Sequence, residues 1–167
     1  AIYSRTGLYT FHGPMGGDFA RGLDKETEQS MRNMLECSSE AGAIPGSGTD
    51  NIKVISEGRG TGRLVGGNLS LVAALMGTPY EIDTRDCILL LEDMSEEPYS
   101  IDRMLHNLKL GGKLQQAAGI VLGDWKDCSP EDPEKSLSLE EVFEDVFGDI
   151  GVPVLSGFKI GHSRTNY

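Results

Sequence analysis

Short apolar runs alternate with stretches of helical periodicity over most of this chain. Two of these runs, at residues 87–91 and 119–123, contain no charged residue and have the length of one strand. Continuous apolar runs of this kind are typical of strands that helices cover on both faces. Shorter strands are expected at 8–11, 52–56 and 153–156. The pattern therefore predicts an α/β protein with a mixed sheet and flanking helices.

Between these runs, apolar residues recur every three or four positions, which is the spacing of one helix face. Helices are expected at residues 25–36, 69–76, 101–108 and 139–147. Each follows a residue type that commonly caps a helix: Asp24, Asn68, Ser100 and Ser138. The Ser138 and Glu141 pair also matches a capping box. Because nothing in the pattern requires a boundary, we expect residues 1–167 to form a single domain.

The charge and composition exclude several functional classes. The chain has 167 residues and a formal net charge of −11, and its lysines and arginines are scattered. A nucleic-acid partner needs a basic face, so none is expected. No apolar stretch approaches the roughly 20 residues of a membrane span, and no targeting pattern opens the chain. We expect a soluble, cytoplasmic protein with no membrane partner.

The cysteines offer no catalytic nucleophile. Cys37, Cys87 and Cys128 have no paired spacing, and their odd number leaves at least one thiol outside any intrachain disulfide framework. Reduced thiols are therefore expected. Cys87 belongs to an apolar run and is interpreted as core, while Cys128 is expected in a polar loop without a group that would activate it.

Two residues stand where catalytic side chains are common. Glu92 ends the apolar run at 87–91, and the carboxyl end of a buried strand is where open α/β sheets place ligand sites. It can equally be a structural carboxylate that caps a helix or pairs with Arg103. His162 follows a glycine in a loop after the last expected strand, a setting that suits a catalytic histidine and a structural one alike.

The remaining polar candidates are weaker. His12 lies in a glycine-rich turn that could approach a ligand, and His106 is expected on the solvated side of its helix. Asp93, together with Glu96 and Glu97, is interpreted as a solvated acidic loop. No His, Asp or Glu pair has a recognised ligand spacing, so neither a metal site nor a cofactor is expected.

A glycine-rich segment at 58–67 precedes the helix expected at 69–76. Exposed amides before a helix can bind phosphate, but the segment lacks the Lys-Ser/Thr pair of a P-loop and the spacing of a dinucleotide fingerprint. Nucleotide binding is therefore disfavoured. Carboxylate binding or close backbone packing suits these glycines better.

Several sequence blocks, taken in order, resemble the carboxyl-terminal domain of the LD-carboxypeptidases, a serine peptidase family that also contains the microcin C7 self-immunity proteins. The blocks are residues 6–8 (TGL), 11–15 (FHGPM), 62–69 (GRLVGGNL), 77–80 (GTPY), 91–93 (LED), 98–105 (PYSIDRML), 119–123 (GIVLG) and 157–162 (GFKIGH). The resemblance covers the whole chain. It implies a swivelling β/β/α-like domain in which residues 1–11 are a linker or the end of a preceding domain.

The resemblance also implies a Ser-Glu-His triad. It assigns the glutamate to Glu92 and the histidine to His162, and it leaves the serine in an upstream nucleophile domain, because Ser4 comes too late to match it. Asn68, with the adjacent Gly67, matches a substrate-contacting position. Without the upstream domain, the chain is expected to be inactive.

The family hydrolyses the L,D-peptide bond that holds the terminal D-alanine of murein tetrapeptides, in the cytoplasm, during wall recycling. The implied partners are thus the nucleophile domain, a murein peptide and a second copy of the protein in a homodimer. A microcin-type peptide–nucleotide amide hydrolase and a non-catalytic peptide-binding module remain alternatives. Thr165 stands where the family usually has proline, before Asn166, so the resemblance leaves the conformation of the loop around His162 open.

Overall fold

The computed structural model describes residues 2–36, 42–43 and 52–167. Its helices are α1 (Ile2–Thr6), α2 (Gly16–Arg21), α3 (Lys25–Glu36), α4 (Leu69–Ala74), α5 (Pro98–Leu110) and α6 (Leu139–Phe147). Its strands are β1 (Lys53–Ser56), β2 (Arg63–Asn68), β3 (Cys87–Met94), β4 (Gly119–Lys126) and β5 (Val154–Ser156). The α/β class with a mixed sheet is confirmed. No helix within these residues is long and apolar enough to cross a membrane.

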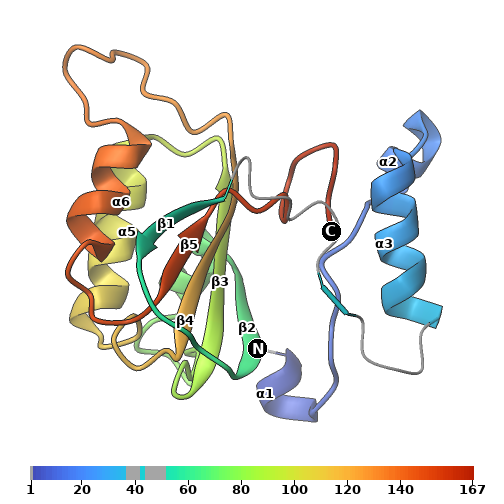
Figure 1. The fold of residues 1–167 in the computed structure, drawn as a ribbon, viewed down its shortest axis with the longest axis horizontal. Helices are drawn as coiled ribbons and strands as arrows, with labels where there is room; N and C mark the ends of the chain where they lie inside the picture. Colours follow the sequence, from blue (N-terminus) through green and yellow to red (C-terminus); the bar gives the residue numbers. More distant parts are fainter. Residues whose placement is uncertain (1, 37–41, 44–51) are drawn as a thin grey trace.

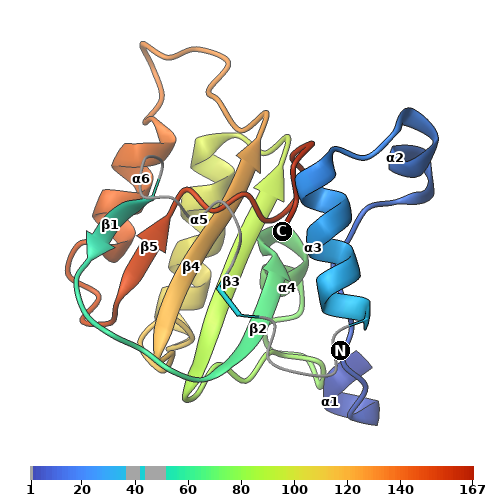
Figure 2. The same cartoon turned by 45° about the vertical axis from the view of Figure 1, so that its right-hand side comes forward.

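The five strands form one sheet in the order β1-β5-β4-β3-β2. Neighbours from β2 to β5 run parallel, whereas β1 runs antiparallel to β5. Helices α5 and α6 pack side by side on one face of this sheet (Figure 1), and α4 lies beside α5 on the same face (Figure 2). In a parallel arrangement, the carboxyl ends of β2, β3 and β4 meet at one edge, so the residues that follow them can form a site.

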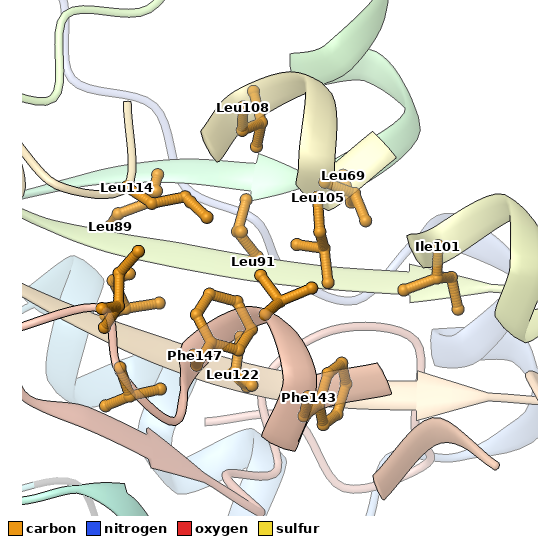
Figure 3. Close-up of a cluster of buried hydrophobic side chains, with 14 of the residues drawn as sticks. Leu69, Leu89, Leu91, Ile101, Leu105, Leu108, Leu114, Leu122, Phe143 and Phe147 are labelled. Atoms are coloured by element: carbon orange, nitrogen blue, oxygen red, sulfur yellow. The ribbon is translucent and has the colours of Figure 1, made fainter. Parts of the chain in front are cut away.

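The hydrophobic core lies between the sheet and these three helices (Figure 3). Leu89 and Leu91 project from β3, and Leu122 from β4, into a layer of aliphatic and aromatic side chains from α5 and α6. Cys128 lies in the loop after β4, as expected, but its side chain is buried in this core. Burial raises the pKa of the Cys128 thiol, which makes it a poorer nucleophile. Cys87 is buried as expected, and Cys37 lies outside the described residues.

Strand β2 is where the sequence pattern was most misleading. Its glycines suggested a loop before a helix, whereas Arg63–Asn68 pairs along β3 in regular parallel register. A Cβ atom at Gly66 would lie 1.9 Å from the carbonyl oxygen of Leu90. The glycine thus allows β2 to approach β3 more closely than a side chain would permit. Two roles were expected for the glycine-rich segment at 58–67, and these contacts show one of them, close backbone packing.

The helix boundaries agree with the capping signals at three of four places. The side chains of Asp24, Asn68 and Ser138 accept hydrogen bonds from the first turns of α3, α4 and α6. The fourth signal was wrong, because α5 begins at Pro98 and not after Ser100. Proline suits the first turn of a helix, where its missing N–H would have no partner.

Residues 2–36 form an arm that lies apart from the helix-covered face (Figure 1). The strand expected at 8–11 is absent from the arm, and these residues carry no regular structure. Both ends of the arm contact the rest of the fold. Near the start, Arg63 donates to the Tyr3 hydroxyl at 2.9 Å and lies over its ring. At the other end, Thr27 of α3 is buried against the C-terminal segment, with the backbone N–H of Asn166 donating to its hydroxyl.

Candidate active site

Glu92 stands at the carboxyl end of β3 and is completely buried. The β3–β4 register shifts there, between Leu91 and Asp93, so that two residues of β4 stand opposite Glu92. Bulges of this kind often turn a side chain toward a functional site. No contact with Arg103 is present among the described interactions of Glu92. The alternative of a Glu92–Arg103 pair is therefore not what the structure contains.

His162 lies beside this carboxylate. Its Nδ1 is 2.6 Å from Glu92 Oε2, and the two residues are 70 positions apart in the chain. An ionised carboxylate can only accept, so Nδ1 carries the proton and donates it to Oε2. In the neutral imidazole, Nε2 then has a free lone pair. The His162 side chain is about one-third exposed, so a reactant can reach the ring.

The loop that carries His162 follows β5 and is called the histidine loop. Its close approach to Glu92 depends on Gly161. This glycine has φ of +139°, and a Cβ atom there would lie 2.7 Å from Glu92 Oε2. Any other residue would combine a strained backbone with a side chain pressed against the carboxylate. Gly161 therefore lets the loop seat His162 directly on the end of β3.

The loop that carries His162 is held by hydrogen bonds on both sides. The Gly161 N–H donates to the Asn166 side-chain oxygen at 3.0 Å, and the Asn166 N–H donates to Thr27 Oγ1 at 2.9 Å. Further along, the Tyr167 hydroxyl donates to Glu26, which raises the pKa of Tyr167 to about 12. The resemblance left the conformation of this loop open, and in the structure Asn166 anchors the loop without the usual proline.

The second oxygen of Glu92 is not satisfied. Oε1 is buried and has no hydrogen-bond partner among the described residues. Nδ1 of His12, on the arm, lies 4.0 Å from this oxygen. The rings of His12 and His162 meet edge to face, with centroids 5.3 Å apart. The structure thus brings His12 into the site, which its position in a glycine-rich turn only hinted at.

Asn68 pairs with Glu92 in the β2–β3 register, so the two side chains leave the sheet at the same edge. Its side-chain oxygen caps α4 by accepting from the Leu71 N–H at 3.1 Å. Its amide nitrogen donates to Asp93 Oδ1 at 2.7 Å. The second N–H of the Asn68 amide has no acceptor among the described residues. Beside it, Gly67 has no heavy atom within 4 Å of the place a Cβ would take, so its backbone borders open space.

Asp93 is a site residue that the sequence interpretation missed. It was expected in a solvated acidic loop, yet it is only 2 % exposed. Besides Asn68, its carboxylate accepts from the N–H and the hydroxyl of Ser70 and from its own neighbour, the Met94 N–H. The available signal was its place directly after a buried strand. A carboxylate with this many donors fixes the start of α4 and the orientation of Asn68.

A second histidine–carboxylate cluster lies on the outer surface of α5 and α6. His106 Nδ1 is 3.0 Å from Asp102 Oδ1 on the same helix, and its Nε2 is 3.9 Å from Asp145 Oδ2 on α6. His106 is thus paired and half-exposed rather than simply solvated. This cluster is far less buried than the first, since the Asp145 side chain is 71 % exposed.

The site at the end of β3 contains a base and the carboxylate that orients it. In the described part of the chain, His162 bonds only to Glu92, and no serine, threonine or cysteine donates to its ring. Such a pair can take a proton from a nucleophile and return it to a leaving group. A nucleophilic triad needs a histidine and a carboxylate in this arrangement.

Comparison with known proteins places this geometry in context. The LD-carboxypeptidase C-terminal domain matches residues 61–167. A probable murein peptide carboxypeptidase of Bacillus subtilis is 47 % identical over 97 % of this chain, which covers 50 % of that protein. The chain therefore spans about half the length of the curated relatives it matches.

Two solved structures share the fold. The muramoyltetrapeptide carboxypeptidase of Oxalobacter formigenes has a TM-score of 0.71 and 27 % identity, over 92 % of this chain and 52 % of that one. The microcin C7 self-immunity protein MccF has a TM-score of 0.74 and 25 % identity, over 96 % and 55 %. That MccF structure carries alanine in place of an active-site serine, asparagine and lysine.

Proposed function

The chain belongs to the LD-carboxypeptidase family, and on that premise we propose that it is the base-supplying half of a serine peptidase acting on murein peptides. The observation that carries the proposal is the 2.6 Å contact between His162 Nδ1 and the buried carboxylate of Glu92. A buried acid that orients an exposed imidazole is the arrangement a serine nucleophile requires. The family membership then selects the reaction, hydrolysis of an L,D-peptide bond with release of terminal D-alanine.

In the proposed mechanism, His162 works through its free Nε2. A serine hydroxyl attacks the carbonyl carbon of the scissile bond while Nε2 takes the hydroxyl proton. The imidazolium then gives this proton to the nitrogen of the departing D-alanine, which leaves an acyl-enzyme. Water repeats the sequence with His162 as base and regenerates the serine. The same ring is base and acid in turn.

Glu92 would keep the imidazole in the tautomer that this sequence needs. Its Oε2 accepts from Nδ1, so the proton stays on Nδ1 and Nε2 remains basic. When His162 becomes charged, the carboxylate at 2.6 Å stabilises the cation. Because Glu92 is fully buried, little water screens this attraction.

We assign substrate contact to Asn68 and Gly67. The free N–H of the Asn68 amide and the open space beside the Gly67 backbone lie at the strand edge that carries Glu92. Asp93 acts through Asn68, because it holds the amide by its other N–H. An active-site asparagine in the MccF structure supports the assignment.

The serine, in this proposal, belongs to a nucleophile domain that precedes residues 1–167, with residues 1–11 as the linker between the two. The support is that the chain spans about half of its relatives' length. Within the same proposal, the protein is cytoplasmic, acts as a homodimer and binds murein peptides.

A microcin-type amide hydrolase is the second candidate. It is favoured by the MccF structures, which share the fold. The murein reaction is preferred because identity to the Bacillus subtilis murein peptide carboxypeptidase is 47 %, against 25 % to MccF. The two candidate enzymes differ in their substrates and share one mechanism.

The test is to express the full-length protein and measure D-alanine release from a murein tetrapeptide. His162→Gln should lower kcat by roughly 10⁴-fold or more, as loss of a triad histidine does. The matched control is His106→Gln, which removes the other paired histidine and should stay within about twofold. Undiminished turnover in His162→Gln would contradict the triad. Peptide binding without any release by the unaltered protein would favour the non-catalytic module.

A further inference from the structure

Three potential metal ligands converge at the end of β3. His12, Glu92 and His162 each offer one ligand atom, and these atoms all lie within 4.8 Å of one another. They come from the arm, the sheet and the histidine loop. No local spacing connects them, which is why the sequence pattern gave no indication of a metal site. The fold alone creates the cluster.

One member of the cluster lacks a partner that its burial calls for. Glu92 is fully buried, and its Oε1 has no hydrogen bond while facing His12 Nδ1 at 4.0 Å. A buried, unpaired carboxylate oxygen destabilises the fold, because nothing replaces the water that it lost. A cation held between Oε1 and the imidazoles would remove that destabilisation.

We propose that His12, Glu92 and His162 bind one divalent transition-metal ion of the zinc class. Two imidazole nitrogens and one carboxylate oxygen are a ligand set that zinc accepts, with water in the fourth position. Zinc distances of about 2.0–2.1 Å place tetrahedral ligand atoms roughly 3.4 Å apart. The separation of 4.0 Å between His12 Nδ1 and Glu92 Oε1 must therefore shorten slightly. His12 can supply the movement, since its side chain is 42 % exposed and lies in a segment without regular structure.

Metal binding would switch off the proposed chemistry. An ion on His162 and Glu92 separates the base from its orienting carboxylate and neutralises the charge that stabilises the imidazolium. Zinc should therefore be a reversible inhibitor of the full-length enzyme. This consequence rests on the proposed function, whereas the binding itself does not.

The Asp102–His106–Asp145 cluster is a built-in control. It also groups one histidine with carboxylates within 4.8 Å. Its members are more exposed, and His106 Nδ1 is already shared between the carboxylate and the backbone oxygen of Asp102. No buried, unpaired oxygen faces it among the described residues, so we expect it to bind zinc far more weakly.

The binding test uses the chain itself and isothermal titration calorimetry with zinc chloride. All proteins carry Cys37→Ser, because a thiol can bind zinc without help from the cluster. The expected result is one tight site per chain. Zinc affinity should fall at least about tenfold in each of the variants His12→Gln, Glu92→Gln and His162→Gln. Loss of a residue that only hydrogen-bonds to a metal ligand already lowers metal affinity by about this factor. His106→Gln should leave it unchanged.

His12→Gln is the decisive variant, since it alters a half-exposed arm residue and should not impair folding. Absence of a tight site in the unaltered chain would overturn the proposal, and so would full zinc affinity in His12→Gln. Loss of the site in His106→Gln alone would move it to the surface of α5 and α6. That result would overturn the proposal as well.

Inhibition is then measured on the full-length enzyme, as the ratio of each variant's rate with and without zinc. The unaltered enzyme should be inhibited and should recover with a chelator, while His12→Gln should need at least about tenfold more zinc. If zinc binds the chain as described but leaves the rate unchanged, the ion site stands and the role of His162 as base fails. The two proposals can therefore fail separately.

Discussion

The described part of the molecule contains two histidine–carboxylate clusters that differ chiefly in burial. In one, His162 meets Glu92, a carboxylate with no exposure, at the end of a central strand. In the other, His106 meets Asp102 and Asp145 on the outer surface of two helices, where the side chains are 35 % and 71 % exposed. The atoms in contact are of the same kinds. The surroundings of these atoms differ between the two clusters.

The difference shows how burial separates a reactive pair from a surface ion pair. Water screens His106 and its partners, so each charge affects its neighbour weakly. At the buried pair, little solvent competes, and each oxygen of Glu92 must find a partner in the protein. His106 lies on α5, where the backbone hydrogen bonds of the helix hold it in place. His162 lies in a loop, which Gly161, Asn166 and Thr27 hold in place.

The largest expected difference is in catalysis. In the full-length protein, Glu92→Gln should lower kcat about 10⁴-fold, because an amide no longer selects the tautomer that leaves Nε2 basic. Asp102→Asn makes the matching change at the surface cluster and should alter kcat less than about twofold. Steady-state D-alanine release measures both. Equal effects of the two substitutions would remove the distinction between the clusters.

The next largest is a difference in stability at the glycine that admits the histidine loop. Gly161→Ala should lower the free energy of unfolding by about 1–3 kcal/mol more than Gly67→Ala. Both glycines have φ near +130°, but only at Gly161 does the added methyl group meet Glu92, at 2.7 Å. Urea denaturation of the chain measures the difference. Equal losses would mean that backbone strain alone matters.

A comparable effect is expected at the connection between the arm and the histidine loop. Thr27→Val keeps the shape of the side chain but leaves the buried Asn166 N–H without an acceptor, at a cost of about 1–3 kcal/mol. Hydrogen exchange should accelerate in residues 160–167. Thr78→Val, which alters an exposed threonine, is the control. Unchanged exchange in the loop would show that the arm does not hold it.

The smallest effect belongs to the surface cluster itself. Asp102→Asn should cost about 0.5 kcal/mol or less in 0.1 M salt, because exposed pairs on one helix contribute little. In 1 M salt the difference should vanish, since charges are then screened within about 3 Å. Urea unfolding at both salt concentrations tests this. A loss above about 1 kcal/mol would mean that this pair is more strongly coupled than its exposure suggests.

The strands and helices that bury a continuous apolar face could be predicted from the sequence. The runs at 87–91 and 119–123 became β3 and β4, and the caps Asn68 and Ser138 start their helices. β2 was missed because its glycines, which serve a close approach to β3, carry the same signal as a loop. The start of α5 was misplaced because proline and serine compete as start signals.

The candidate site was only partly visible in the sequence. Glu92 and His162 were singled out by their positions after strands and by resemblance to a family, and the structure brings them together. Asp93 was misjudged, because a run of acidic residues is usually solvated and only the fold shows which member is buried. His12 could not be assigned, since its proximity to Glu92 depends on the path of the arm.

The tie between Thr27 and Asn166 also bears on the order of folding. It joins residues 139 positions apart, and the His162–Glu92 contact spans 70, whereas Asp102 and His106 are four apart. Closing a long loop lowers the entropy of the chain before the contact it allows can stabilise the fold. Contacts between residues far apart in the sequence therefore form late. The surface pair can assemble with its helix while the chain is still being synthesised. The contact between Glu92 and His162 is expected to form later. Until then, the Glu92 carboxylate has no histidine partner.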